Sequence, residues 1–96
     1  MNPTISAPRT EPGVNRKLTA RQLLVLRAAD TYFRREGLLP SYEDLTVETG
    51  FAAKSNVHGI IRELSERGLV TTRPTLARSI RLTAAGQRAL ETQAEF

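Results

Sequence analysis

Apolar residues recur at helical spacing along the first half of the chain, between residues that typically begin and end helices. Thr19 and Gln22 have the spacing of a capping box, and Gly37 can end a helix in a left-handed conformation, which predicts a helix from about 20 to 36. The expected core stripe of this helix is Val25, Ala28, Ala29, Tyr32 and Phe33.

A second start signal follows directly. Pro40 prevents the first helix from continuing, and Ser41 with Asp44 repeats the capping-box spacing. We expect a short helix from about 42 to 49 that ends at Gly50. A third helix starts within a few residues, so a tight turn containing glycine joins the two, as in a helix-turn-helix.

The third helix is predicted over about 54–67, where four aliphatic residues stand at i, i+3, i+4 and i+7 and Gly68 follows. These residues are Val57, Ile60, Ile61 and Leu64. At 100° per residue, Ser55, Gly59 and Arg62 point away from them, with Asn56 and His58 on the flanks. A buried stripe therefore supports an exposed polar row.

The remaining chain predicts a hairpin and a last helix. The segment 69–72 is β-prone, 73–78 reads as a turn, and 79–82 alternates polar and apolar residues, which is typical of a two-stranded hairpin. Thr83 can cap a helix over 84–93, although Gly86 weakens that helix by roughly 1 kcal/mol relative to Ala.

The polar row of the third helix suits the major groove of DNA. There Asn can pair with adenine, Arg with guanine, and Ser or His with several base edges. Ser55, Asn56 and His58 lie at the N-terminal end of the helix, the end that meets bases in helix-turn-helix proteins. Gly59 either lets the helix approach the groove closely or is a tolerated helix defect.

Charge is concentrated in the same region. Between Lys54 and Arg81 there are six basic and two acidic residues, so this segment carries the whole net charge of +4. Arg73 and Arg78 lie in the predicted turn of the hairpin. Such clustering is typical of phosphate contacts, and a merely solvated surface remains the alternative for any single arginine.

Composition limits the other classes of function. With 96 residues the chain fits one small domain with tails, and the absence of cysteine excludes disulfides and thiolate metal ligands. We find no membrane span or signal peptide, which favours a cytoplasmic, nucleoid-associated protein. Residues 1–17 are rich in proline and read as a flexible arm, either a plain leader or an extra phosphate contact.

An enzyme is not expected, because the chain has one His, no glycine-rich phosphate loop and no acidic cluster with metal-ligand spacing. We therefore expect no catalytic residue, metal, cofactor or small-molecule ligand.

Several motifs together resemble the N-terminal DNA-binding domain of the SOS repressor LexA. The similar segments are LTARQLLVLRAADTYFRREGLLPSYEDL, AKSNVHGIIRELSERGLV and RPTLARSIRL, within residues 17–82. The resemblance implies a winged helix that binds double-stranded DNA. It places Ser55, Asn56, His58 and Gly59 where the groove-contacting residues of the family lie, and Arg73 and Arg78 on the wing. Lys54 and Arg62, on the same helix, are expected DNA contacts as members of the basic cluster.

The sequence also departs from that family. Ala53 stands where the family often has a capping Ser, and Asn56 replaces a Gly or Ala. The family continues into a protease domain that also dimerises, whereas this sequence ends at Phe96. Ala85 and Gly86 match the family's cleaved Ala-Gly bond, but LTAAGQRAL equally resembles the helix after the wing in MarR-like regulators, the interpretation that we favour. We then expect a homodimer contact through this helix and no self-cleavage.

These observations predict an α+β, mainly α protein: a winged helix-turn-helix of three helices and a two-stranded wing, with an extra C-terminal helix. The expected parts are an arm (1–17), a DNA-binding domain (18–82) and a C-terminal helix (83–96). The expected function is that of a sequence-specific transcriptional regulator, a repressor, that reads the major groove with the third helix. The alternative is a winged-helix module that binds another regulator or a polymerase.

Overall fold

A winged helix-turn-helix with an added C-terminal helix is formed by residues 17–93, the part of the chain that the computed structural model describes. Its elements follow in the order α2 (Ala20–Glu36), α3 (Tyr42–Thr49), α4 (Lys54–Glu66), β2 (Val70–Thr71), β3 (Arg81–Leu82) and α5 (Ala84–Gln93). The predicted fold class and all the predicted helices in this range are confirmed.

Local signals account for the starts of α2 and α3. The hydroxyl of Thr19 accepts from the Gln22 N–H at 3.1 Å, and the Gln22 side chain accepts from the Thr19 N–H at 3.0 Å. Ser41 and Asp44 form the same reciprocal pair at α3. Each capping box satisfies two backbone donors that the helix leaves unpaired, so both predicted starts are confirmed.

The turn between α3 and α4 depends on Gly50. Its φ of 78° lies in the left-handed region, and its N–H donates back to the carbonyl of Thr46 at 3.0 Å. Glycine adopts this conformation without the steric cost that other residues carry. The chain therefore reverses within a few residues and brings α4 across α3, as helix-turn-helix geometry requires.

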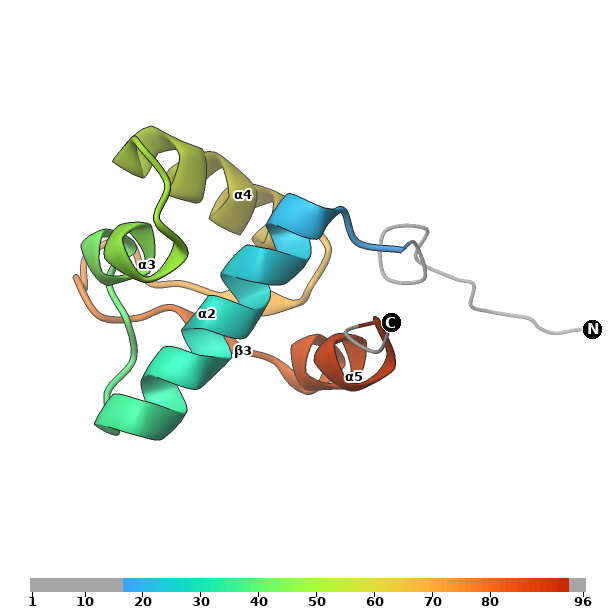
Figure 1. Ribbon diagram of the computed structural model, residues 1–96. Coiled ribbons are helices and arrows are strands. Elements are labelled where there is room, and N and C mark those ends of the chain that lie inside the picture. Colours follow the sequence, from blue (N-terminus) through green and yellow to red (C-terminus); the bar gives the residue numbers. More distant parts are fainter. Residues whose placement is uncertain (1–16, 94–96) are drawn as a thin grey trace, which may run out of the picture.

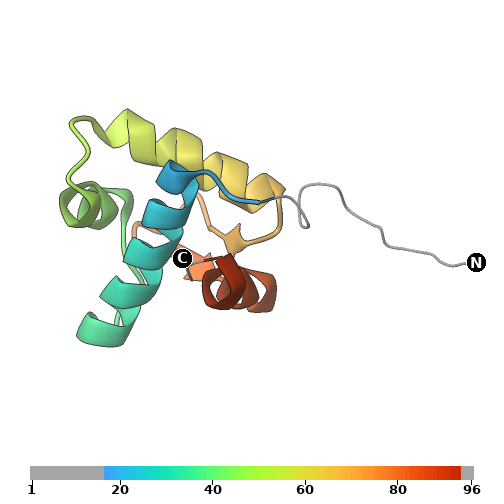
Figure 2. The same ribbon diagram turned by 45° about the vertical axis from the view of Figure 1, so that its right-hand side comes forward.

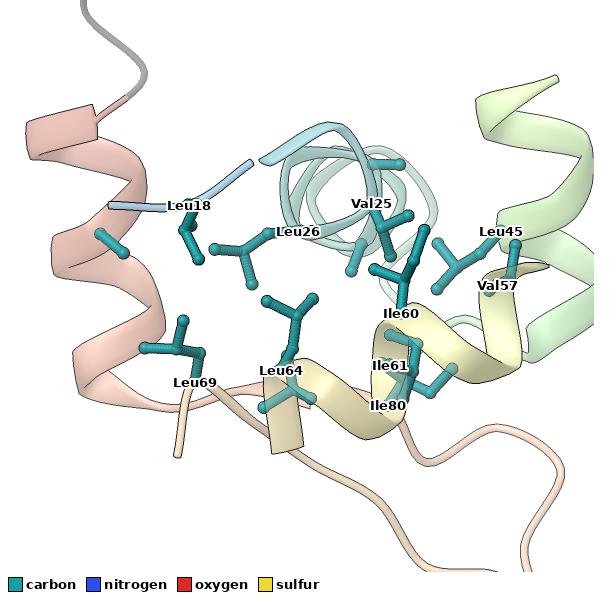
Figure 3. Close-up of a cluster of buried hydrophobic side chains, with 14 residues drawn as sticks. Leu18, Val25, Leu26, Leu45, Val57, Ile60, Ile61, Leu64, Leu69 and Ile80 are labelled. Atoms are coloured by element: carbon teal, nitrogen blue, oxygen red, sulfur yellow. The ribbon is translucent and has the colours of Figure 1, made fainter. Parts of the chain in front are cut away.

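The helices enclose a single core. In both views α2 runs between α3 and α5, with α4 across its N-terminal end (Figure 1, Figure 2). Figure 3 shows side chains from α2, α3 and α4 meeting Leu69 and Ile80 of the hairpin segment. The largest fully buried side chains include Leu26, Leu45, Ile61, Leu64 and Ile80.

The buried stripe predicted for α2 is wrong at Phe33. Val25, Ala28 and Ala29 are buried as expected, but Phe33 is 45% exposed and Leu26 is fully buried in its place. The cause is tertiary: α2 packs against α3, α4, α5 and β3, and the face that these contacts bury includes Leu26 rather than Phe33.

The wing is shorter than predicted. Only two residues of each strand pair, Val70 with Leu82 and Thr71 with Arg81, rather than the whole of 69–72 and 79–82. Beyond them the buried hydroxyl of Ser79 donates to the carbonyls of Arg73 and Leu76 and accepts from the Arg73 N–H at 2.9 Å. Hydrogen bonds of the Ser79 side chain thus hold the wing together where the sequence predicted a longer β-ladder.

α5 packs onto the same core. Thr83 caps it as predicted, because its hydroxyl accepts from the Gly86 N–H at 3.0 Å. Gly86 is buried, and a Cβ at this position would lie 2.2 Å from the carbonyl oxygen of Leu69. The glycine that costs helix propensity therefore permits a close approach of helix and hairpin. The Gln93 side chain accepts from the Leu18 N–H at 2.6 Å, which links α5 to the start of α2.

The predicted N-terminal arm lies outside the described residues, except for Lys17. Within residues 17–93 there is no helix long and apolar enough to cross a membrane.

Candidate nucleic-acid interface

The outer face of α4 presents the row that the sequence predicted. Lys54, Ser55, Asn56, His58 and Arg62 are all exposed, and Gly59 is half-buried. The opposite face is fixed by four buried aliphatic residues, namely Val57, Ile60, Ile61 and Leu64. The helix is therefore anchored by its inner side and offers an amide, a hydroxyl, an imidazole and two cations on its outer side.

The N-terminal end of α4 carries uncompensated positive charge. Ala53 is the N-cap and makes no side-chain hydrogen bond, and the first turn has no acidic residue. Free N–H groups and the helix dipole make such an end attractive to an anion. Lys54 adds a full charge at the same place. The departure from the capping Ser noted above thus leaves backbone donors open.

One side of α4 faces the first turn of α2. Ser55, Asn56 and Gly59 line a shallow hollow of about 440 Å³ together with Arg21 and Gln22 of α2. The guanidinium carbon of Arg21 lies 4.8 Å from the centre of the Phe51 ring, which holds this arginine beside the start of α4. Arg21 was not predicted from the sequence, because nothing local shows that α2 begins next to α4.

The other side of α4 faces α3 and the hairpin. The rings of His58 and Tyr42 are stacked, with centres 3.7 Å apart and an angle of 10° between planes. Both line a second hollow, of about 270 Å³, with Arg62 and Thr72. Tyr42 was also missed, although its place in the first turn of α3 was predicted. The stack restricts the orientation of His58.

Gly59 has no packing reason to be glycine. A Cβ built at this position meets nothing within 4 Å, and the residue is in an ordinary helical conformation. A glycine in a helix interior costs about 0.5–1 kcal/mol relative to alanine. This cost is compensated by no contact within residues 17–93.

The two predicted wing arginines differ. Arg73 is exposed, and its backbone is tied to Ser79. Arg78 reaches across to the helices: its Nη1 donates to the Tyr32 hydroxyl at 3.0 Å and to the Asp44 carboxylate. Arg78 is thus an ion-paired residue in the structure, a partnership that its expected place on the wing did not predict. Neither arginine lines the hollows beside α4.

Asp44 is held as an anion in this arrangement. Burial of its carboxyl opposes ionisation, but hydrogen bonds from the backbone and hydroxyl of Ser41, the charge of Arg78 and a hydrogen bond from Tyr32 together lower the pKa of Asp44. The hydrogen bond with Tyr32 and the charge of Asp44 raise the pKa of Arg78. The pair is therefore ionised throughout the neutral range.

The described residues contain no group of three or more His, Cys, Asp or Glu side chains placed to hold a metal ion.

Comparison with known proteins finds a match to the LexA DNA binding domain over residues 15–79. The LexA repressor of Bacillus licheniformis is 36% identical over 66 residues, which cover 69% of this chain and 32% of that protein. The LexA repressor of Bacillus subtilis is 35% identical over 66 residues, with the same coverage. That of Rhodospirillum rubrum is 33% identical over 63 residues, covering 66% of this chain and 25% of that protein. The chain thus spans about a third or less of the length of these relatives.

Proposed function

The chain belongs to the LexA DNA-binding domain family, and from this premise we propose that it is a sequence-specific transcriptional repressor that binds double-stranded DNA. The relatives named above are repressors. The observation that carries the proposal is the outer face of α4, where exposed Ser55, Asn56 and Arg62 stand on a helix anchored by its opposite side.

In this proposal α4 enters the major groove. Ser55 and Asn56 stand in its first turn, where a recognition helix meets base edges, and Asn56 has the donor and acceptor that suit adenine. Lys54 and the uncapped amides beside it bind a phosphate. His58, oriented by Tyr42, and Arg62 contact bases or phosphates farther along the helix. Gly59 lets the helix axis approach the groove.

In this proposal the wing contributes contacts to the DNA backbone. Arg73 is exposed at the start of the wing loop, and Arg78 lies at its end with about half of its side chain exposed. We propose that both bind phosphates or the minor groove, which fixes position rather than sequence. Arg21 joins this set, because it is held at the edge of the hollow that Ser55 and Asn56 line.

A homodimer remains a prediction. One small module offers few base contacts, and pairing on two half-sites would add specificity. The outward positions of α5 are Ala84, Arg88, Glu91 and Thr92, and Leu90 packs partly against the core. A dimer through α5 would therefore use a largely polar face.

Selection of bound sequences from a random duplex pool tests the function. We expect an enriched motif, with two half-sites if the protein dimerises. We also expect affinity for that duplex to fall by an order of magnitude or more as salt rises severalfold, because several phosphates are neutralised. Equal affinity for all duplexes would show that the protein binds DNA without sequence specificity, and that part of the proposal would be wrong. Absence of duplex binding would favour a module that binds another protein.

A further inference from the structure

A side-chain cluster joins three separate elements at the wing. Tyr32 comes from α2, Asp44 from the first turn of α3, and Arg78 from the end of the wing loop. The contacts span 46 and 34 positions in sequence. Within residues 17–93, these two contacts are the side-chain hydrogen bonds that connect the loop between β2 and β3 (the wing loop) to the helices. The hydrogen bonds of Arg73 and Ser79 stay within that loop.

The cluster uses only one edge of the arginine. Both hydrogen bonds of the Arg78 side chain within residues 17–93 come from Nη1, one to the Tyr32 hydroxyl at 3.0 Å and one to Asp44 Oδ2. Nε and Nη2 make no hydrogen bond to the described residues, and 46% of the side chain is exposed. A guanidinium has a rigid fork of donors, so its Nε–Nη2 edge can bind two oxygens of a phosphate while Nη1 stays bound.

Stability alone does not explain the arrangement. Ion pairs as exposed as this one contribute little to folding, because solvent screens them and two side chains must be ordered. Asp44 is already held by Ser41 through the capping box, and the same Oδ2 accepts from the Ser41 N–H at 2.9 Å. The carboxylate is therefore a fixed point against which a flexible arginine is oriented.

We propose that Tyr32 and Asp44 are positioning residues that hold the guanidinium of Arg78 by Nη1, so that its Nε–Nη2 edge is preorganised to bind a DNA phosphate. This inference rests on the proposed DNA binding and adds to it two residues that touch no DNA. Its physical basis is entropic: a long side chain that is already ordered loses less freedom on binding.

The hydroxyl of Tyr32 provides the cleanest test, because Tyr32→Phe changes no charge. Affinity is measured by fluorescence anisotropy with full-length protein, using the most enriched duplex of the selection and a random-sequence duplex of equal length. We expect Tyr32→Phe to weaken both complexes about three- to tenfold. The dependence of affinity on salt should not change, because the phosphate contact itself remains. The melting temperature should stay within about 4 °C of the wild-type value.

Arg78→Ala should weaken both complexes more, and should make the slope of log affinity against log salt shallower by about one. Adding Tyr32→Phe to Arg78→Ala should then cause no further loss, because the hydroxyl acts only through the arginine. Undiminished binding by Tyr32→Phe, or a full additional loss in the double variant, would overturn the inference.

Asp44→Asn tests the carboxylate, and Glu43→Gln is its matched control, since it removes the same charge from an exposed neighbour in the same helical turn. Asn can still accept from the Ser41 N–H, so the cap is retained. We expect Asp44→Asn to bind DNA more weakly than Glu43→Gln. Tighter binding would mean that Asp44 withholds the arginine from DNA, and the inference would be wrong. If wild-type protein binds neither duplex, the proposed function fails as well.

Discussion

Replacing Gly59 with alanine should separate the two explanations for a glycine in the middle of α4. The position is helical, and the new methyl group meets no atom of the described chain within 4 Å. Alanine lowers the entropy of the unfolded chain and raises helix propensity, so Gly59→Ala should stabilise the fold by about 0.5–1 kcal/mol. For a domain of this size, that gain raises the melting temperature by roughly 2–8 °C.

DNA binding should change in the opposite direction. If α4 lies in the groove with Gly59 against the duplex, the methyl group fills space that the complex needs. Overfilling a closely packed contact costs about 1–3 kcal/mol. Every 1.4 kcal/mol is about tenfold in the dissociation constant, so affinity should fall by roughly five- to 150-fold. A more stable protein that binds DNA less tightly is the expected result.

Thermal unfolding followed by circular dichroism measures the first effect, and anisotropy with the selected duplex measures the second. Thr31→Ala is the control, because Thr31 is an exposed helical residue of α2 that lines neither hollow beside α4. It should leave DNA affinity nearly unchanged. Wild-type affinity in Gly59→Ala would show that the glycine is only a tolerated helix defect, and a lower melting temperature would refute the stability argument.

Three further predictions test other parts of the structure. Gly86→Ala should lower the melting temperature by at least about 4 °C, because its Cβ would lie 2.2 Å from the Leu69 carbonyl oxygen; an unchanged value would refute the close approach. Asp44 should make the wild type more stable than Asp44→Asn at neutral pH. This difference in the free energy of unfolding should be lost as pH falls below 3.8, because folding lowers the pKa of Asp44. Chemical unfolding at a series of pH values measures the difference, and a value that does not change with pH would contradict the prediction. Asn56→Ala should relax base preference at one or two positions in a repeated selection, whereas Lys54→Ala should weaken all duplexes alike with a salt slope shallower by about one. Identical behaviour of these two variants toward good and poor sites would contradict their assigned roles.

Local signals in the sequence were sufficient for the helices. Both capping boxes and the glycine at the end of α3 act within a few residues, so their effects do not depend on the rest of the fold. The same holds for the face of α4, where Val57, Ile60 and Ile61 recur at steps of three and four residues that a helix places on one face.

Contacts between distant segments were not accessible in the same way. The stack of Tyr42 on His58 and the bonds of Arg78 depend on how α2, α3 and the wing meet in space. Sequence spacing says which way a side chain points from its own helix, but it does not say what lies opposite. This is why Phe33 was assigned to the core, and why the ion pair of Arg78 with Asp44 was not predicted.

The close contact between α5 and the hairpin also bears on proteolysis of the chain. Proteases bind a substrate segment in an extended conformation, but the bond between Ala85 and Gly86 lies in the first turn of a helix. The Gly86 N–H is bound to Thr83, and its Cα is packed against the backbone of Leu69. Cleavage at this bond therefore requires α5 to unwind first. Its rate is then limited by the free energy of that local opening, rather than by the identity of the two residues at the bond.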